Sequence, residues 1–228
     1  MNKKIKLSAL FIIALLAVPQ LSQGAHPVFK GSFLPPNNLR ISVNSLAAKG
    51  LTEKQFNAVI DEIEAIYTPI VAAKGAKLVI NRLWDDPTVN SDAEEENDKW
   101  IINSYGGLAR DQHITQDGFA LVACHEMGHH LGGAPKYNGG GDWASNEGEA
   151  DYFSTSKCLH LMFSSPASKH FTHTSAGNDL AIAKAACAKS YPKWHWKARA
   201  VCVRSAMAGL SVTGLLAELS QGPHRKAV

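Results

Sequence analysis

Apolar side chains recur at helical spacing directly after residue 51. Thr52 and Gln55 form a capping box, in which two side chains three residues apart satisfy backbone amides at a helix start. Gly75 can close the helix, and Pro69 is expected to kink it or to end it early. We therefore predict a helix between residues 52 and 75, whose apolar face consists of Phe56, Val59, Ile60, Ile63, Ile66 and Tyr67.

Two short β-rich runs follow this helix. The segments AKLVINRLW at 76–84 and KWIINSYGG at 99–107 are typical of strands. Between them, residues 85–98 contain a turn and an acidic patch. Because the acidic residues lack the alternate spacing of a calcium-binding loop, we interpret this patch as a solvated loop.

Helical patterns occupy the second half of the chain. Thr115 is expected to open a helix that ends at Gly132 and Gly133, and Ser145 to cap another that runs to about Phe163. Two more helices are predicted near 177–190 and 194–219, whereas 26–50, which is rich in proline, is expected to be irregular. A helix, then strands, then helices is typical of an α+β fold.

The first 25 residues differ in character from the rest. Three lysines precede an apolar run over 7–18, and the small residues Ser22 and Gly24 follow it. This pattern is typical of a signal peptide, and the run is shorter than the roughly 20 residues of a membrane span. We predict an exported protein, periplasmic or secreted, with 1–25 as signal peptide, 26–228 as a single domain, and no stable membrane insertion after cleavage.

The charge of the chain changes when this leader is set aside. It carries three of the 23 Lys and Arg residues, so 20 remain against 20 Asp and Glu. Nucleic-acid binding depends on clustered basic residues. The balanced charge therefore argues against a nucleic-acid partner.

Four cysteines lie outside the leader: Cys124, Cys158, Cys187 and Cys202. None belongs to a CxxC pair, which disfavours a cysteine zinc site. An even number in an exported chain predicts two disulfides, with three possible connectivities. The short separation of Cys187 and Cys202 favours that pair.

The strongest chemical signal is ACHEMGHHLGG at 123–133. Residues four apart share one face of a helix, so the imidazoles of His125 and His129 can bind one metal ion. Glu126 is rotated about 100° from His125 around the helix axis, which places it beside the metal. There its carboxylate can accept a proton from water and later deliver it to a leaving amine. We therefore predict one catalytic Zn²⁺.

A catalytic zinc needs a third protein ligand, and SNEGEADYF at 145–153 offers one. Within a helix, Glu147 and Glu149 point nearly opposite ways, so only one can face the metal. Asp151 shares the face of Glu147, whereas Phe153 shares that of Glu149. We predict that Glu147 is the ligand and that Asp151 accepts a hydrogen bond from a ligand imidazole, that of His125.

HEMGH, followed 18 residues later by Glu147 in an ExxxD pattern, resembles the gluzincin zinc metallopeptidases. EGEADYF at 147–153 is similar to the HtpX, CAAX-prenyl-protease and Oma-type group. The resemblance implies a zincin-like domain that hydrolyses peptide bonds, with an active-site edge strand formed near 88–93 and 100–105. This chain lacks the membrane-spanning helices of that group, so a soluble minimal version acting on a peptide or protein substrate is implied.

The segment YPKWHWKAR at 191–199 weakly resembles the part of that group which stabilises the oxyanion of the reaction. A tyrosine stands where the group has histidine. Tyr191, His195 and Arg199 are therefore candidates for this role. The alternative is the start of an amphipathic helix with packing tryptophans.

Other zinc classes fit the sequence less well. A metzincin needs histidine at position 135, where this chain has Pro135. An aspartate-ligand site would require Asp142 to return to the metal, and His130 lies off the ligand face, at the helix surface or behind a ligand. A non-catalytic zinc-containing binding module of the cell envelope is the alternative from another function class. Glu126 argues against it, since a structural site needs no base beside the metal.

Overall fold

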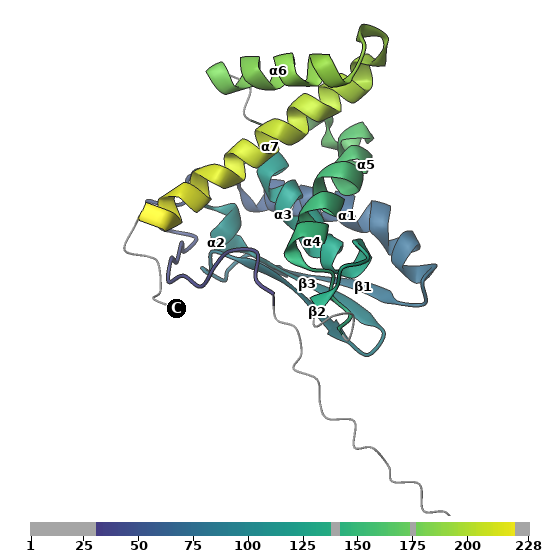
Figure 1. Ribbon diagram of the computed structural model, residues 1–228. Helices are drawn as coiled ribbons and strands as arrows, with labels where there is room; N and C mark the ends of the chain where they lie inside the picture. Colours follow the sequence, from purple (N-terminus) through teal and green to yellow (C-terminus); the bar gives the residue numbers. More distant parts are fainter. Residues whose placement is uncertain (1–30, 138–141, 174–176, 222–228) are drawn as a thin grey trace, which may run out of the picture.

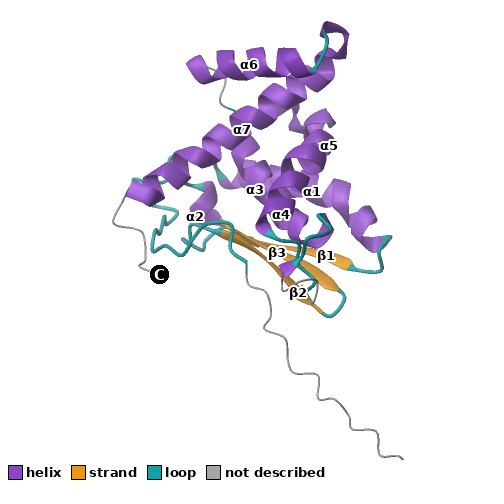
Figure 2. Ribbon diagram, in the orientation of Figure 1, coloured by secondary structure: helices purple, strands orange, loops and turns teal. Residues whose placement is uncertain are grey.

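A computed structural model describes residues 31–137, 142–173 and 177–221 of the chain. Figures 1 and 2 show a small sheet covered on one face by helices, which confirms the expected α+β class. The predicted signal peptide lies outside the described residues. In chain order the main elements are α1 (Glu53–Ala72), β1 (Lys77–Leu83), β2 (Ser91–Glu96), β3 (Lys99–Tyr105), α2 (Gly106–Ala109), α3 (Gln116–Leu131), α4 (Glu147–Phe153), α5 (Leu159–Ser164), α6 (Asn178–Ser190) and α7 (Trp196–Gln221).

Helix α1 begins with the capping box that the sequence predicts. The Thr52 side chain accepts from the Gln55 amide, while the Gln55 side chain accepts from the Thr52 amide. Pro69 lies inside the helix, which continues to Ala72. The apolar face packs into the core, where Phe56 and Ile63 are fully buried.

The sheet has the strand order β1-β3-β2, with β1 parallel and β2 antiparallel to β3. Strand β2 occupies most of the acidic patch, so the interpretation of this patch as a solvated loop was wrong. Ser91 and Ala93 alternate with acidic residues and are the buried members of the strand. Because these buried residues are small, their alternation is a weak hydrophobic signal. The Asp92 carboxylate accepts from Asn103 and from Tyr105 on β3.

The predicted irregular segment near the N-terminus runs antiparallel to the chain around β2. Isolated bridges join Ser32 to Asp92 and Arg40 to Thr88. Leu34 is fully buried in the core, and the Phe33 amide donates to the Ser91 carbonyl oxygen. This segment therefore covers part of the outer edge of β2.

Helix α3 is the central helix of the molecule. It is buried along nearly its whole length and packs against α1, α4, α7, β2 and β3. Thr115 caps it as predicted. Its neighbour α4 begins one residue later than expected, because Asn146 rather than Ser145 caps it. A π-helical turn, Ser154–Cys158, then connects α4 to α5.

The disulfides are Cys124–Cys158, which joins α3 to the π-helical turn, and Cys187–Cys202, which joins α6 to α7. The second is the pair favoured by the sequence.

Residues 193–221, which include α7, are long and apolar enough by length and composition to cross a membrane, although no such segment beyond the leader was expected. Part of this apolar surface belongs to the core, since Val201, Ala208, Val212 and Leu215 of α7 are buried there, but only 33% of the apolar stretch is buried.

Candidate metal centre

The two histidines of the HEMGH motif lie side by side on α3. Their rings form an edge-to-face pair with centroids 4.8 Å apart. Both side chains are buried, at 3% exposure for His125 and 0% for His129. The four-residue spacing predicted that the two imidazoles lie close together. Both are covered because α3 is buried by the elements packed around it.

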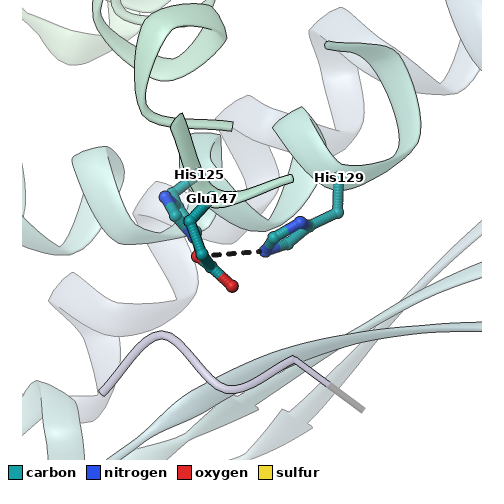
Figure 3. A group of neighbouring side chains, drawn as sticks. All are labelled: His125, His129 and Glu147. Carbon is teal, nitrogen blue, oxygen red and sulfur yellow. Dashed lines mark ion pairs between the residues drawn. The ribbon is translucent and has the colours of Figure 1, made fainter. Parts of the chain in front are cut away.

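Glu147 reaches both imidazoles from the first turn of α4. Its Oε2 lies 3.0 Å from His125 Nε2 and 3.8 Å from His129 Nε2. Figure 3 shows the three side chains converging on one point. One ligand atom from each lies within 4.8 Å of the other two, so the group could hold a metal ion.

Hydrogen bonds on the far side of each ring orient the histidines. Asp151 Oδ1 lies 2.8 Å from His125 Nδ1, as the shared face of Glu147 and Asp151 suggested. The Ser145 carbonyl oxygen lies 2.8 Å from His129 Nδ1. A carbonyl oxygen can only accept, so Nδ1 of His129 carries the proton and its Nε2 presents a lone pair toward Glu147.

Two buried imidazoles meet a partly exposed carboxylate at this point, since the side chain of Glu147 is 47% exposed. Burial lowers the pKa of His125, but the hydrogen bonds to Asp151 and Glu147 outweigh it and raise the pKa to about 10. Burial raises the pKa of Glu147, whereas its hydrogen bonds to His125 and Tyr137 bring it down to about 2. For His129, burial is the main cause that lowers the pKa. The protein thus surrounds this point with carboxylates that favour a cation.

Glu126 follows His125 on α3, is fully buried, and is close enough to His125 and Glu147 for their charges to affect its pKa. The Ser91 hydroxyl is close to its carboxylate but donates to the Asn103 carbonyl oxygen. Among the described residues, neither carboxylate oxygen has a hydrogen-bond partner. Burial raises the pKa of Glu126 to about 8, although His125 opposes the change. A buried carboxylate without protein partners fits a place that holds water beside a metal.

Tyr137 is a residue of this site that the sequence did not single out. Its hydroxyl donates to Glu147 Oε1 at 2.6 Å, and its ring lies 6.5 Å from that of His129. Tyr137 therefore holds the second oxygen of the ligand carboxylate. In the sequence, only its position in the loop between the two ligand helices could have indicated that Tyr137 belongs to the site.

The N-terminal segment also contributes to the site. The Phe33 ring meets the His125 ring edge to face at a centroid distance of 5.0 Å. A cleft of about 480 Å³ opens beside these rings, and Asp151, Val212 and Leu216 also line it. This cleft gives the metal group access to solvent.

Gly128, which lies between the two histidines on α3, sets the distance between the ligand helices. A Cβ at this position would lie 2.6 Å from the Cα and 2.7 Å from the carbonyl oxygen of Ala150 on α4. Only glycine lets α3 and α4 pack this closely. The approach brings Glu147 to the histidines.

The structure does not bring the predicted oxyanion residues to this site. Tyr191 and His195 lie at the turn between α6 and α7, Arg199 lies at the start of α7, and His195 is exposed. The α7 residues that line the cleft begin at Gly209. At 1.5 Å per residue, His195 lies roughly 20 Å further along the helix. The role predicted for Tyr191 and His195 therefore has no geometric support, because both residues lie just before α7, at the end of this continuous helix that is away from the cleft (Figure 1).

The structure also places two other side chains that the sequence analysis considered. His130 was expected at the helix surface or behind a ligand, but it is a buried core residue whose ring is stacked between Trp100 and Trp143 at centroid distances of 5.1 and 4.6 Å. Burial lowers its pKa to about 3. Asp142 accepts from the amide of Trp143 and does not belong to the metal group.

Comparisons with known proteins identify no relative. The chain matches no protein-family model, no curated protein and no solved structure.

Proposed function

We propose that this protein is an exported zinc-dependent endopeptidase with a zincin-like domain. The observation that carries the proposal is the fully buried Glu126 carboxylate, without a described protein partner, beside a His-His-Glu group. A structural metal site gains nothing from such a carboxylate, whose burial is unfavourable. A hydrolytic site needs it as a base.

The donor set supports zinc as the metal. Two imidazole nitrogens and one carboxylate oxygen, with a position left for water, are the ligands of many catalytic zinc sites. Two disulfides suggest an oxidising, extracellular environment, which agrees with export. Bound zinc would supply a Lewis acid that polarises the scissile carbonyl and acidifies water.

The residues of the chain would divide the remaining work. Glu126 accepts the proton of the attacking water and returns it to the leaving amine. Asp151 and the Ser145 carbonyl oxygen hold the two imidazoles in place. Tyr137 fixes the carboxylate of Glu147 through its hydroxyl.

The outer edge of β2 supports a peptide substrate. The carbonyl oxygen of Ser91 points away from β3 and accepts from the Phe33 amide. Because every second residue of a strand directs its backbone groups to the same side, those of Ala93 and Glu95 also point outward. An extended peptide could continue this pairing along β2 and pass beside Glu126.

The test compares the wild type with Glu126→Gln, each with its zinc content measured, in a digest of a peptide library. We expect the substitution to lower turnover by roughly 10²- to 10⁴-fold, as for loss of a general base, while zinc remains bound. Glu149→Gln, a nearby carboxylate on α4 outside the metal group, is the matched control and should cut normally. Equal cutting by wild type and Glu126→Gln, or no cutting by zinc-loaded wild type, would leave the non-catalytic envelope module as the better explanation.

A further inference from the structure

Helices α6 and α7 form a projecting hairpin, and its tip near residues 191–197 is not part of the metal centre. Figure 1 shows α6 lying across the far end of α7, away from the sheet. Helix α6 buries only Ala183 and Cys187, and the disulfide Cys187–Cys202 ties it to α7. The hairpin is therefore a braced arm that adds little to the core.

The tip of this arm exposes large apolar side chains. Residues 193–197, with the sequence KWHWK, are all exposed. Trp194 is 77% exposed and Trp196 is 65% exposed, and Ile182 on α6 is exposed to 65%. Two tryptophans so uncovered are unusual in a soluble protein, which normally covers most of such rings.

The arm also carries a positive charge, which does not show in the nearly equal totals of basic and acidic residues for the whole chain. Residues 180–217 contain six Lys and Arg residues and no Asp or Glu. With these six and the three leader lysines set aside, 14 of the 23 basic residues remain against 20 acidic ones. One of the six, Arg204, pairs with Asp117 of α3. The other five lie on a basic arm attached to an acidic body.

We propose that residues 180–199, the docking arm, bind the surface of a membrane that contains anionic lipids. Tryptophan rings prefer the headgroup level of a bilayer, and flanking lysines add attraction to anionic lipid. A cleft of about 570 Å³ beside Trp196 adds to this surface, and its apolar lining includes Leu180, Val203 and Met207. Lys184 and Arg199 also line it and can bind a lipid phosphate. The arm, which includes the first turn of α7, lies on the membrane surface, and the buried residues of α7 from Val201 onward stay in the core.

A second copy of the chain is a poorer occupant of this surface. Pairing two arms would bring like charges together, which opposes association. An anionic bilayer instead satisfies the tryptophans and the lysines at once.

The test uses the chain from residue 26, with disulfides intact, because the apolar leader would itself bind lipid. Vesicles of one part phosphatidylglycerol to three parts phosphatidylcholine are compared with vesicles of phosphatidylcholine alone. We expect co-sedimentation with the anionic vesicles, weakened by added salt. Tryptophan emission should shift to the blue, since Trp194 and Trp196 are exposed whereas the other three tryptophans are largely covered.

Two variants separate the contributions. Lys193→Gln/Lys197→Gln should weaken binding by roughly 25-fold, at about five-fold for each lysine near an anionic surface. Trp194→Ser/Trp196→Ser should abolish the emission shift. The matched control, Lys54→Gln/Lys74→Gln, removes two exposed lysines near α1 and should bind like the wild type. Glu126→Gln should also bind normally, so failure of the peptidase proposal would leave this one standing.

Three outcomes would overturn the proposal. One is equal binding by the wild type and the lysine pair variant, with both retaining native circular dichroism. Another is the absence of wild-type binding to anionic vesicles at low salt. A third is a dimer in light scattering that the Trp194→Ser/Trp196→Ser variant loses, which would show that the arm pairs with a second copy.

Discussion

At the scale of single residues, His125 depends on a side chain one helix away. Its Nδ1 lies 2.8 Å from Asp151, while Nε2 faces Glu147. The imidazole can serve a metal only if its Nδ1 proton is held and its ring is kept in this plane. Asp151 is exposed, so its contribution comes from this one contact.

We expect Asp151→Asn to weaken zinc binding by roughly 10- to 100-fold, because a neutral amide is a weaker acceptor behind a ligand histidine than a carboxylate. Competition with a chromophoric chelator measures the affinity. Glu149→Gln, two residues earlier on α4, should leave it unchanged. An affinity that is the same in Asp151→Asn and the wild type would contradict the role assigned to Asp151.

At the scale of helices, the site depends on how closely α4 packs against α3. Gly128 on α3 faces the backbone of Ala150 on α4 at this contact. The disulfide Cys124–Cys158 ties the π-helical turn that follows α4 to α3. The ligand positions on the two helices thus share one rigid contact.

Gly128→Ala should destabilise the protein by about 1–3 kcal/mol, because the added methyl group must push α4 away. The same displacement should weaken zinc binding. Gly209→Ala on α7 is the control, since no described atom lies within 4 Å of its added Cβ. It should stabilise by about 0.5–1 kcal/mol through helix propensity alone. Urea unfolding distinguishes the two, and equal stability of both variants would contradict the packing argument.

A buried ion pair anchors α7 to the first turn of α3. Arg204 Nε lies 2.6 Å and its second terminal nitrogen 2.7 Å from the two oxygens of Asp117, which is fully buried. The guanidinium also lies 4.0 Å above the Phe163 ring. This pair connects α7, just after the docking arm, to the helix that carries the histidines.

Arg204→Met should lower the free energy of unfolding by about 3–5 kcal/mol, because it leaves the Asp117 charge buried without its partner. Asp117→Asn/Arg204→Met removes that charge and should recover part of the loss. Denaturant titration of both variants measures the difference. A double variant no more stable than Arg204→Met would show that the charge is not the cause.

At the scale of the whole molecule, a bound metal would connect two distant stretches of the chain. His125 and His129 belong to α3, whereas Glu147 follows a loop of 15 residues. A ligand that binds only the folded state stabilises it according to its concentration and affinity.

Zinc at about 100 times its dissociation constant should add about 2.7 kcal/mol to the stability. For a chain of this size, that raises the melting temperature by roughly 5–10 °C. Differential scanning calorimetry with zinc and with a chelator measures the shift. His129→Ala should show no shift, and identical melting of the wild type under both conditions would argue against a metal site.

Much of the local structure was predictable because it depends on neighbouring residues. The capping box at Thr52 and Gln55 and the helix opened by Thr115 follow from backbone geometry over a few residues. Strand β2 was not predicted from its residues, since its burial rests on small side chains opposite α3. The role suggested for His195 came from a loose resemblance that the length of α7 does not support.

The sequence alone determined that His125 and His129 share one helix face, because four residues make about one helical turn. It also indicated that Glu147 and Asp151 lie on a common face, for the same local reason. Only the tertiary structure decided that these faces meet, that Glu126 is sealed from solvent, and that Tyr137 holds the ligand carboxylate. Those features depend on the close packing of α3 against α4 at Gly128, a contact between residues distant in sequence.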